Sequence, residues 1–129
     1  MVSLTLEQIL QLHALVLVKD GGADGVRDVG RLEAAVSTQH QVVFGEELYA
    51  TVFTKAAALM RGIIGDHPFA DGNKRTAMLA GLTLLEVNGS NFTAQRGELE
   101  NFAVRVATDH LDIDAIADWL ERHSQTRVS

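Results

Sequence analysis

The chain has 129 residues, with 11 basic and 17 acidic side chains, a formal net charge of −6 and no cysteine. The length allows one domain with a single core, and the missing cysteines exclude disulfides, thiolate metal sites and cysteine nucleophiles. The negative charge argues against a broad nucleic-acid surface. Because neither an export signal nor an apolar run of about 20 residues is present, we expect a cytoplasmic protein without membrane contact.

Apolar residues recur at helical spacing along most of the chain, and the period-two alternation of strands is almost missing. This pattern predicts an all-α fold, a compact bundle of about six helices around one buried central helix. The first predicted helix spans residues 6–18 and starts with a capping box of Thr5 and Gln8. Its inner stripe comprises Leu6, Ile9, Leu10, His13 and Leu17. Because His13 lies on this stripe, we interpret it as a core histidine.

A second helix follows a glycine-rich segment. The glycines within residues 21–25 lack the Gly-Lys-Ser/Thr ending of a P-loop, so they predict a plain turn between helices. Asp28 is placed to cap the second helix, which we expect to run to Ser37. A less regular segment, residues 39–46, comes next.

The remaining elements are also mainly helical. They are two long helices over residues 48–64 and 73–87 and two closing helices over residues 98–108 and 112–123. The helix over 73–87 is apolar almost all round, which predicts that it is the central one, and Asn88-Gly89 ends it. Residues 91–93 are predicted to be briefly extended, and residues 124–129 to form a flexible tail. Residues 1–129 thus form a single predicted domain.

The segment from His67 to Arg75 reads His-Pro-Phe-Ala-Asp-Gly-Asn-Lys-Arg and connects the two long helices. Lys74 and Arg75 therefore fall at the N-terminus of the second long helix. A helix N-terminus carries unpaired N–H groups and the positive end of the macrodipole, so cations are unfavourable there. The two cations indicate that an anion binds at this point, and a phosphate suits the amides and both side chains.

This motif resembles that of the Fic/Doc family, whose pattern is His-x-Phe-x-Asp/Glu-Gly/Ala-Asn-Gly/Lys-Arg. The upstream segment 28–35, Asp-Val-Gly-Arg-Leu-Glu-Ala-Ala, adds to the resemblance, which extends from Leu12-His13 to Trp119-Leu120. It is closest to the Doc branch, the "death on curing" toxins of bacterial toxin–antitoxin pairs. The resemblance implies a Fic/Doc-type helical fold, a transferase that moves phosphate-containing groups onto a protein hydroxyl, ATP as the substrate and Mg²⁺ as the cofactor.

The resemblance also implies roles in the reaction for two motif residues. His67 would be the catalytic base that accepts the proton of the attacking hydroxyl, because imidazole titrates near neutrality. Asp71 would bind the Mg²⁺ that bridges phosphate oxygens. Judged from residue types alone, His67 and Asp71 also fit a transition-metal site, but a third ligand is missing nearby.

The other motif residues would bind the nucleotide or support the loop. Gly72 would let a phosphate approach the helix-start amides, and Asn73 would donate to a phosphate or to the adjoining turn. Lys74 and Arg75 would neutralise the charge that develops on the transferred group. Phe69 would pack the loop against the core.

Two positions divide the family by chemistry. Members that attach a whole nucleotide monophosphate usually have glycine in place of Lys74 and a second arginine in place of Met78. The residues present here are typical of the Doc branch, which transfers only the terminal phosphate. Pro68 and Gly72, however, are common among nucleotidyl transferases, so AMPylation of a protein hydroxyl stays open as the alternative. A non-catalytic binding module with a retained Fic fold is a third interpretation.

The resemblance also suggests partners. Many Fic proteins inhibit themselves through a Ser/Thr-x-x-x-Glu-Gly/Asn helix, but the segment Ser3 to Gln8 ends in glutamine and does not match. We therefore expect an antitoxin protein that binds the active-site face. The implied target belongs to the translation machinery, with elongation factor Tu as the first candidate, and no direct nucleic-acid partner is expected. Residues 39–44 stand where the family has a target-docking flap, or they form an ordinary loop.

Overall fold

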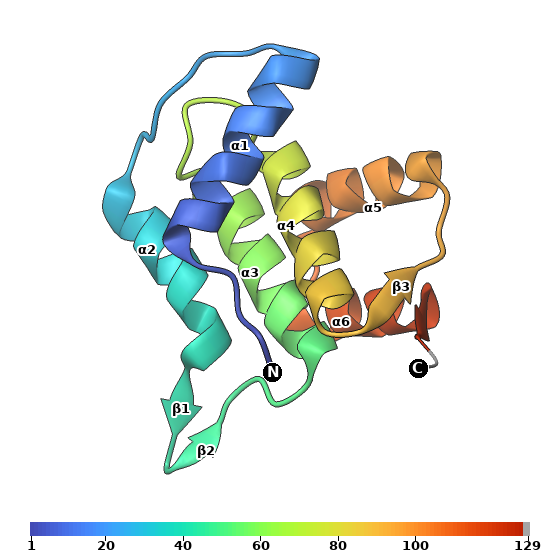
Figure 1. Cartoon of the computed structure of the whole chain (residues 1–129). Coiled ribbons are helices and arrows are strands. Elements are labelled where there is room, and N and C mark those ends of the chain that lie inside the picture. The colour runs from blue at the N-terminus through green and yellow to red at the C-terminus, as the bar shows by residue number, and fades with distance from the viewer. Residues whose placement is uncertain (128–129) are drawn as a thin grey trace.

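A computed structural model of the chain describes residues 1–127 and shows a mainly helical fold (Figure 1). Its helices are α1 (Leu6–Asp20), α2 (Val29–Ser37), α3 (Val52–Asp66), α4 (Asn73–Val87), α5 (Arg96–Thr108) and α6 (Ile113–Arg122). Two small antiparallel sheets join β1 (Val42–Val43) to β2 (Glu46–Glu47) and β3 (Ser90–Phe92) to β4 (Ser124–Thr126). The predicted helical bundle is confirmed.

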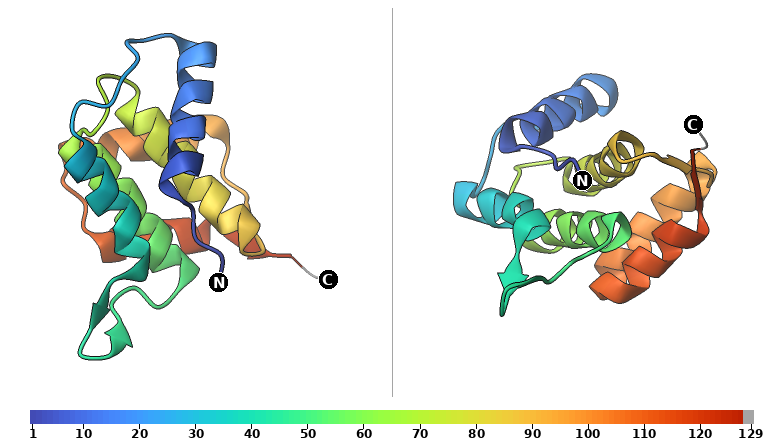
Figure 2. Two further views of the ribbon diagram at one scale, coloured as in Figure 1. Left: turned by 60° about the vertical axis from the view of Figure 1, so that its left-hand side comes forward. Right: turned by 60° about the horizontal axis from the view of Figure 1, so that its bottom comes forward.

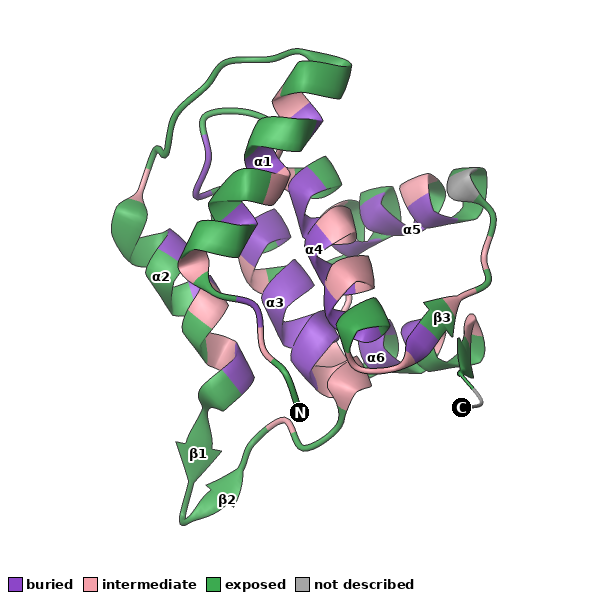
Figure 3. Cartoon of the chain, in the orientation of Figure 1, coloured by how far each residue is buried: buried purple, intermediate pink, exposed green. Residues whose placement is uncertain are grey.

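Helices α3 and α4 form the centre of the bundle, with α1 and α2 on one side and α5 and α6 on the other (Figures 1 and 2). Small side chains let these two helices approach closely, since a Cβ atom on Gly81 would lie 2.5 Å from the Met60 sulfur. The buried faces of α3 and α4 meet along this contact (Figure 3). The prediction of one central helix was therefore incomplete, because α3 shares that place with α4.

Capping residues explain where most helices begin. The predicted capping box of Thr5 and Gln8 is confirmed, and Asp28 caps α2 as expected. Helix α3 begins later than predicted, at Val52, because the Thr51 hydroxyl accepts a hydrogen bond from the Thr54 amide and fixes the helix start there. The predicted bounds of α4 agree with the structure.

The C-terminal segment differs from the prediction of a flexible tail. Ser124–Thr126 form strand β4, which pairs with β3, and the Arg127 amide donates to the Gly89 carbonyl at 2.8 Å. The prediction of a tail over 124–129 is therefore wrong for residues 124–126. Residues 128 and 129 lie outside the described part of the chain.

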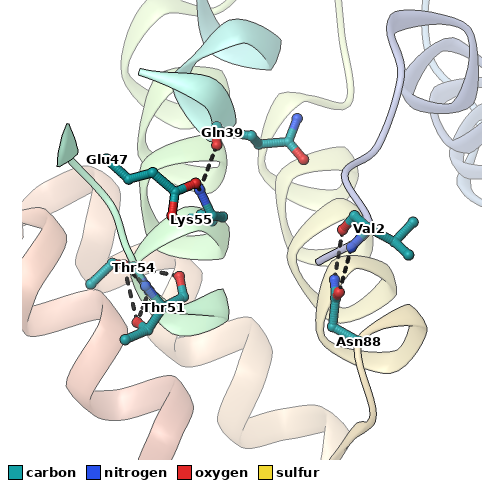
Figure 4. A network of polar contacts seen from close by, with 7 residues as sticks. All are labelled: Val2, Gln39, Glu47, Thr51, Thr54, Lys55 and Asn88. Atoms are coloured by element: carbon teal, nitrogen blue, oxygen red, sulfur yellow. Dashed lines mark hydrogen bonds and ion pairs between the residues drawn. The ribbon is translucent and has the colours of Figure 1, made fainter. Parts of the chain in front are cut away.

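The β1–β2 hairpin is fixed to the N-terminal end of α3 by a buried cation (Figure 4). The Lys55 ammonium is almost completely buried, and it donates to the Gln39 carbonyl at 2.7 Å and to the Glu47 carboxylate at 2.9 Å. The hydrogen bond and the positive charge of Lys55 lower the pKa of Glu47. The segment that we expected to be irregular is thus a short 3-10 helix, Thr38–His40, followed by this hairpin.

Among the described residues, none of the helices has both the length and the apolar character that a membrane span needs.

Candidate active site

The motif forms the loop between the two central helices. His67 ends α3 in the left-handed conformation, with φ 48° and ψ 58°, and its side chain is exposed to solvent. Gly72 also has a left-handed conformation, with φ 77°, and is the N-cap of α4. Two residues with positive φ thus reverse the chain between antiparallel neighbours, and the short connection brings the predicted base close to the start of α4.

Buried aromatic packing supports this loop from the core side. Phe69 is buried as predicted, and its ring stacks on the His13 ring with the centroids 3.8 Å apart and the planes 7° apart. His13 is itself buried, and its Nε2 atom donates to the Asp71 carbonyl at 2.8 Å. The interpretation of His13 as a core histidine is confirmed, but its contacts add a second role, because His13 fixes the peptide that precedes Gly72.

The Asn73 side chain closes the loop by a pair of hydrogen bonds. Its Nδ2 donates to the Phe69 carbonyl, and its Oδ1 accepts from the Phe69 amide, both at 3.0 Å. Of the two roles that the sequence left open for Asn73, these contacts correspond to binding of the adjoining turn. The first residue of α4 thus determines the conformation of the loop that carries His67.

The segment between α1 and α2 lies along the motif loop. The amides of Arg27 and Asp28 both donate to the Pro68 carbonyl, at 2.7 and 3.0 Å. In the other direction, the Ala70 amide donates to the Gly25 carbonyl at 3.0 Å. The interpretation of this glycine-rich segment as a plain turn was therefore incomplete, because the segment also holds the site in place.

Asp71 presents an exposed carboxylate at the end of the loop. One oxygen accepts from the Gly72 amide at 2.9 Å, and the other accepts from the Ala23 amide at 3.3 Å. Within the described residues no cluster of three histidine or acidic side chains could hold a metal ion. A single carboxylate such as that of Asp71 is still compatible with Mg²⁺. This ion commonly takes only one or two carboxylates from the protein and completes its shell with substrate phosphates and water.

The N-terminus of α4 lacks a side-chain cap, although Thr5, Asp28, Thr51 and Asp112 each cap another helix. Its first turn carries no acidic residue, and its two cations, Lys74 and Arg75, are exposed. The Arg75 guanidinium lies 3.3 Å from the Asp20 carboxylate. A cavity of about 260 Å³ lies over this turn and is lined by Lys74, Arg75, Met78, Glu100, Asn101, Ala103 and Val104. An uncapped helix start with two exposed cations is a feature that favours an anion.

The structure brings the predicted site residues together on one loop and one helix turn. His67 and Asp71 belong to the loop, and Lys74 and Arg75 follow it directly. Sequence reasoning missed the Ala23 amide on Asp71 and the contact of Asp20 with Arg75, because neither partner belongs to a recognisable motif.

The position of residues 39–44 decides between the two interpretations of that segment. The hairpin binds at the first turn of α3, whereas His67 caps the opposite end (Figure 1). The 15 residues of α3 span about 22 Å at 1.5 Å per residue. The segment therefore lies too far from His67 to align a target hydroxyl there, which contradicts the interpretation as a flap in this conformation.

Comparison with known proteins agrees with this geometry. Residues 3–85 match the Fic/DOC family. The chain is 41% identical over 101 residues to "Toxin Doc" of Mycolicibacterium smegmatis, which covers 75% of this chain and 76% of that protein. It is 34% identical over 119 residues to "Protein kinase doc" of Escherichia phage P1, which covers 90% of each. The chain therefore belongs to the Fic/Doc family and is similar to its Doc toxins.

Proposed function

We propose that this chain is the toxin of a toxin–antitoxin pair and transfers the terminal phosphate of ATP to a hydroxyl group of a target protein. The observation that carries the proposal is the uncapped start of α4, where Lys74 and Arg75 stand directly after the loop of His67 and Asp71. The names of the two relatives, one a toxin and one a protein kinase, support the same conclusion.

The start of α4 would bind the terminal phosphate. Its unpaired amides and the positive end of the helix dipole favour an anion, and Lys74 and Arg75 add two charges. Bound Mg²⁺ would neutralise further negative charge on the phosphates, and Asp71 is the residue that would hold it. Gly72 adds no capping side chain to this helix start.

His67 would act as the general base. Its exposed imidazole would accept the proton of the target hydroxyl while the hydroxyl oxygen forms a bond to the terminal phosphorus. The bond between that phosphorus and the bridging oxygen breaks, and ADP leaves with the electron pair. The products are a phosphorylated target, ADP and a proton that His67 passes on to solvent.

Transfer of a nucleotide monophosphate is the second candidate function. The conformation of Gly72 weakens one of the two sequence arguments for it. Gly72 has φ 77°, and a Cβ atom there would lie 3.3 Å from Val16 Cγ1. Backbone conformation and packing are therefore enough to require this glycine, so it no longer favours nucleotidyl transfer. Pro68 still favours nucleotidyl transfer, whereas Lys74 and Met78 favour transfer of the terminal phosphate.

The same face of the molecule is the one that we propose the antitoxin covers. An antitoxin that covers Lys74 and Arg75 would block the phosphate site without any change in the fold. As the target we propose a protein of the translation machinery, with elongation factor Tu as the first candidate, and the expected effect is growth arrest.

Two forms of labelled ATP test this function. The purified chain is incubated with cell extract and ATP that carries the label either at the terminal or at the innermost phosphate. We expect label on a target protein only from the terminal position, and none with His67→Asn. Transfer from the innermost position would show nucleotidyl transfer, and no transfer from either would favour the non-catalytic binding module.

A further inference from the structure

A cavity of about 290 Å³ opens beside His67, on a side that Lys74 and Arg75 do not line. One wall is the last turn of α3, with Gly65, and the other is the end of α5 and the segment after it, with His110. His67 therefore borders this cavity and also belongs to the loop that leads to the phosphate site.

The charges around this cavity disfavour a phosphate. Helices α3 and α5 both end here, so the negative ends of two helix dipoles point toward it, whereas α4 begins at the phosphate site with its positive end. The exposed Asp66 carboxylate adds negative charge at the rim. Arg61 adds a positive charge, and its Nε donates to the Leu111 carbonyl at 3.2 Å. The nucleotide phosphates therefore belong to the start of α4 and not to this cavity.

The lining of the cavity combines apolar and polar groups. Ile64 and Val106 are each only 3% exposed, and Ala107 and Leu111 pack partly buried against the core. His67 and Asp66, both exposed, contribute polar groups to the lining. The apolar part of this lining suits an uncharged side chain that enters while its backbone stays at the edge.

We propose that this cavity is the acceptor subsite of the enzyme. It receives an aliphatic or aromatic side chain that neighbours the target hydroxyl in the target protein, and so brings that hydroxyl to His67. The inference rests on the proposed function, because it uses His67 as the group that accepts the hydroxyl proton. It goes further by giving the target a defined recognition feature and a defined place on the enzyme.

Gly65 offers a way to fill the cavity without disturbing the fold. It lies in helix α3 and lines the cavity, and a Cβ atom there would meet no other atom within 4 Å. Gly65→Leu therefore places a side chain in open space, and Gly65→Ala gives a smaller version of the same change. Gly97→Leu is the matched control, because Gly97 is an exposed helical glycine of α5 with equally open space and lies outside the cavity.

The variants are compared by transfer of terminal-phosphate label to protein in a desalted bacterial extract. Initial rates are measured over a series of extract concentrations and a series of ATP concentrations. Gly65→Leu should raise the half-saturating extract concentration by roughly tenfold or more, the effect of losing one buried apolar side chain. Gly65→Ala should have an intermediate effect, Gly97→Leu none, and no variant should change the half-saturating ATP concentration.

The other outcomes overturn the inference in distinguishable ways. A wild-type enzyme that labels no protein would contradict the proposed function and the subsite together. Normal extract dependence of a folded Gly65→Leu enzyme would contradict the subsite alone. A raised half-saturating ATP concentration would assign the cavity to the nucleotide. Mass spectrometry of the labelled protein gives a second test, because an aliphatic or aromatic residue must lie within one or two positions of the modified hydroxyl.

Discussion

The two ends of helix α3 use polar residues in opposite ways. At the N-terminal end, the Lys55 ammonium is buried and donates to the Glu47 carboxylate and the Gln39 carbonyl. At the C-terminal end, the uncharged Asn73 side chain holds the loop, and the Lys74 side chain remains exposed. The difference teaches that a charged residue near a loop does not by itself mark a site. We expect a site where the backbone is held in place and a charge, such as that of Lys74, stays available to a ligand.

The largest expected effect comes from the exposed base. His67→Asn should reduce phosphate transfer by about 10²–10⁴-fold, the usual contribution of a general base, and relieve growth arrest. Asparagine tolerates the left-handed conformation of His67, so the free energy of unfolding should change by less than about 0.5 kcal/mol. Rate measurements and urea unfolding check both statements. Toxicity equal to that of the wild type would show that His67 is not the base.

Asn73→Ala should damage both stability and transfer. Loss of the hydrogen bonds to Phe69 should lower the free energy of unfolding by about 1–3 kcal/mol. Transfer by the protein that remains folded should fall by about 10²-fold, because the loop of His67 loses its geometry. Asn91→Ala, at an exposed strand position, is the control and should do neither. A stability loss without a rate loss would mean that the loop keeps its shape without this clamp.

Lys55→Met tests the opposite end of α3, where we expect an effect on stability alone. The Gln39 carbonyl loses its buried donor, which should lower the free energy of unfolding by about 1–3 kcal/mol, while the transfer rate of the folded enzyme stays unchanged. The same substitution at the exposed Lys19 should cost less than about 0.5 kcal/mol. A large loss of transfer at full stability would show that the two ends of α3 are coupled.

The smallest effect concerns the pH dependence of stability. Because Lys55 lowers the pKa of Glu47 in the folded chain, this carboxylate stabilises the fold fully above its unfolded-state pKa, near 4.5. The contribution is lost as the pH falls through the lower folded-state pKa. Glu47→Gln should therefore remove part of the acid sensitivity seen in urea unfolding. Identical pH profiles of wild type and variant would show that the contact contributes nothing.

The sequence predicted well those features that neighbouring residues determine, and it predicted tertiary contacts poorly. The bounds of α4 follow from the motif before it and from Asn88-Gly89 after it, and both signals lie close to the helix ends they fix. The predicted start of α3 at residue 48 is too early, because the apolar residues before Thr51 resemble a continuation of the helix. Strand β4 was missed because three residues in an extended pair carry no periodic signal of their own.

For the site, the motif predicts which side chains react but not the contacts that hold them. His13 carries no sequence sign of its hydrogen bond to the Asp71 carbonyl, since 58 positions separate the two residues. The cavity beside His67 combines residues from α3 and α5, whose packing only the fold provides. Adjacent residues thus predict the chemistry, whereas the support of the loop depends on contacts between distant residues.

The most direct test of the central claim is the mass that the enzyme adds to its target. The wild-type chain and its His67→Asn variant are expressed in bacteria, and proteins of the translation machinery are analysed by mass spectrometry. We predict the addition of a single phosphate group on a hydroxyl side chain in the wild type only. The addition of a whole nucleotide monophosphate, or the same modification with the His67→Asn variant, would contradict the account.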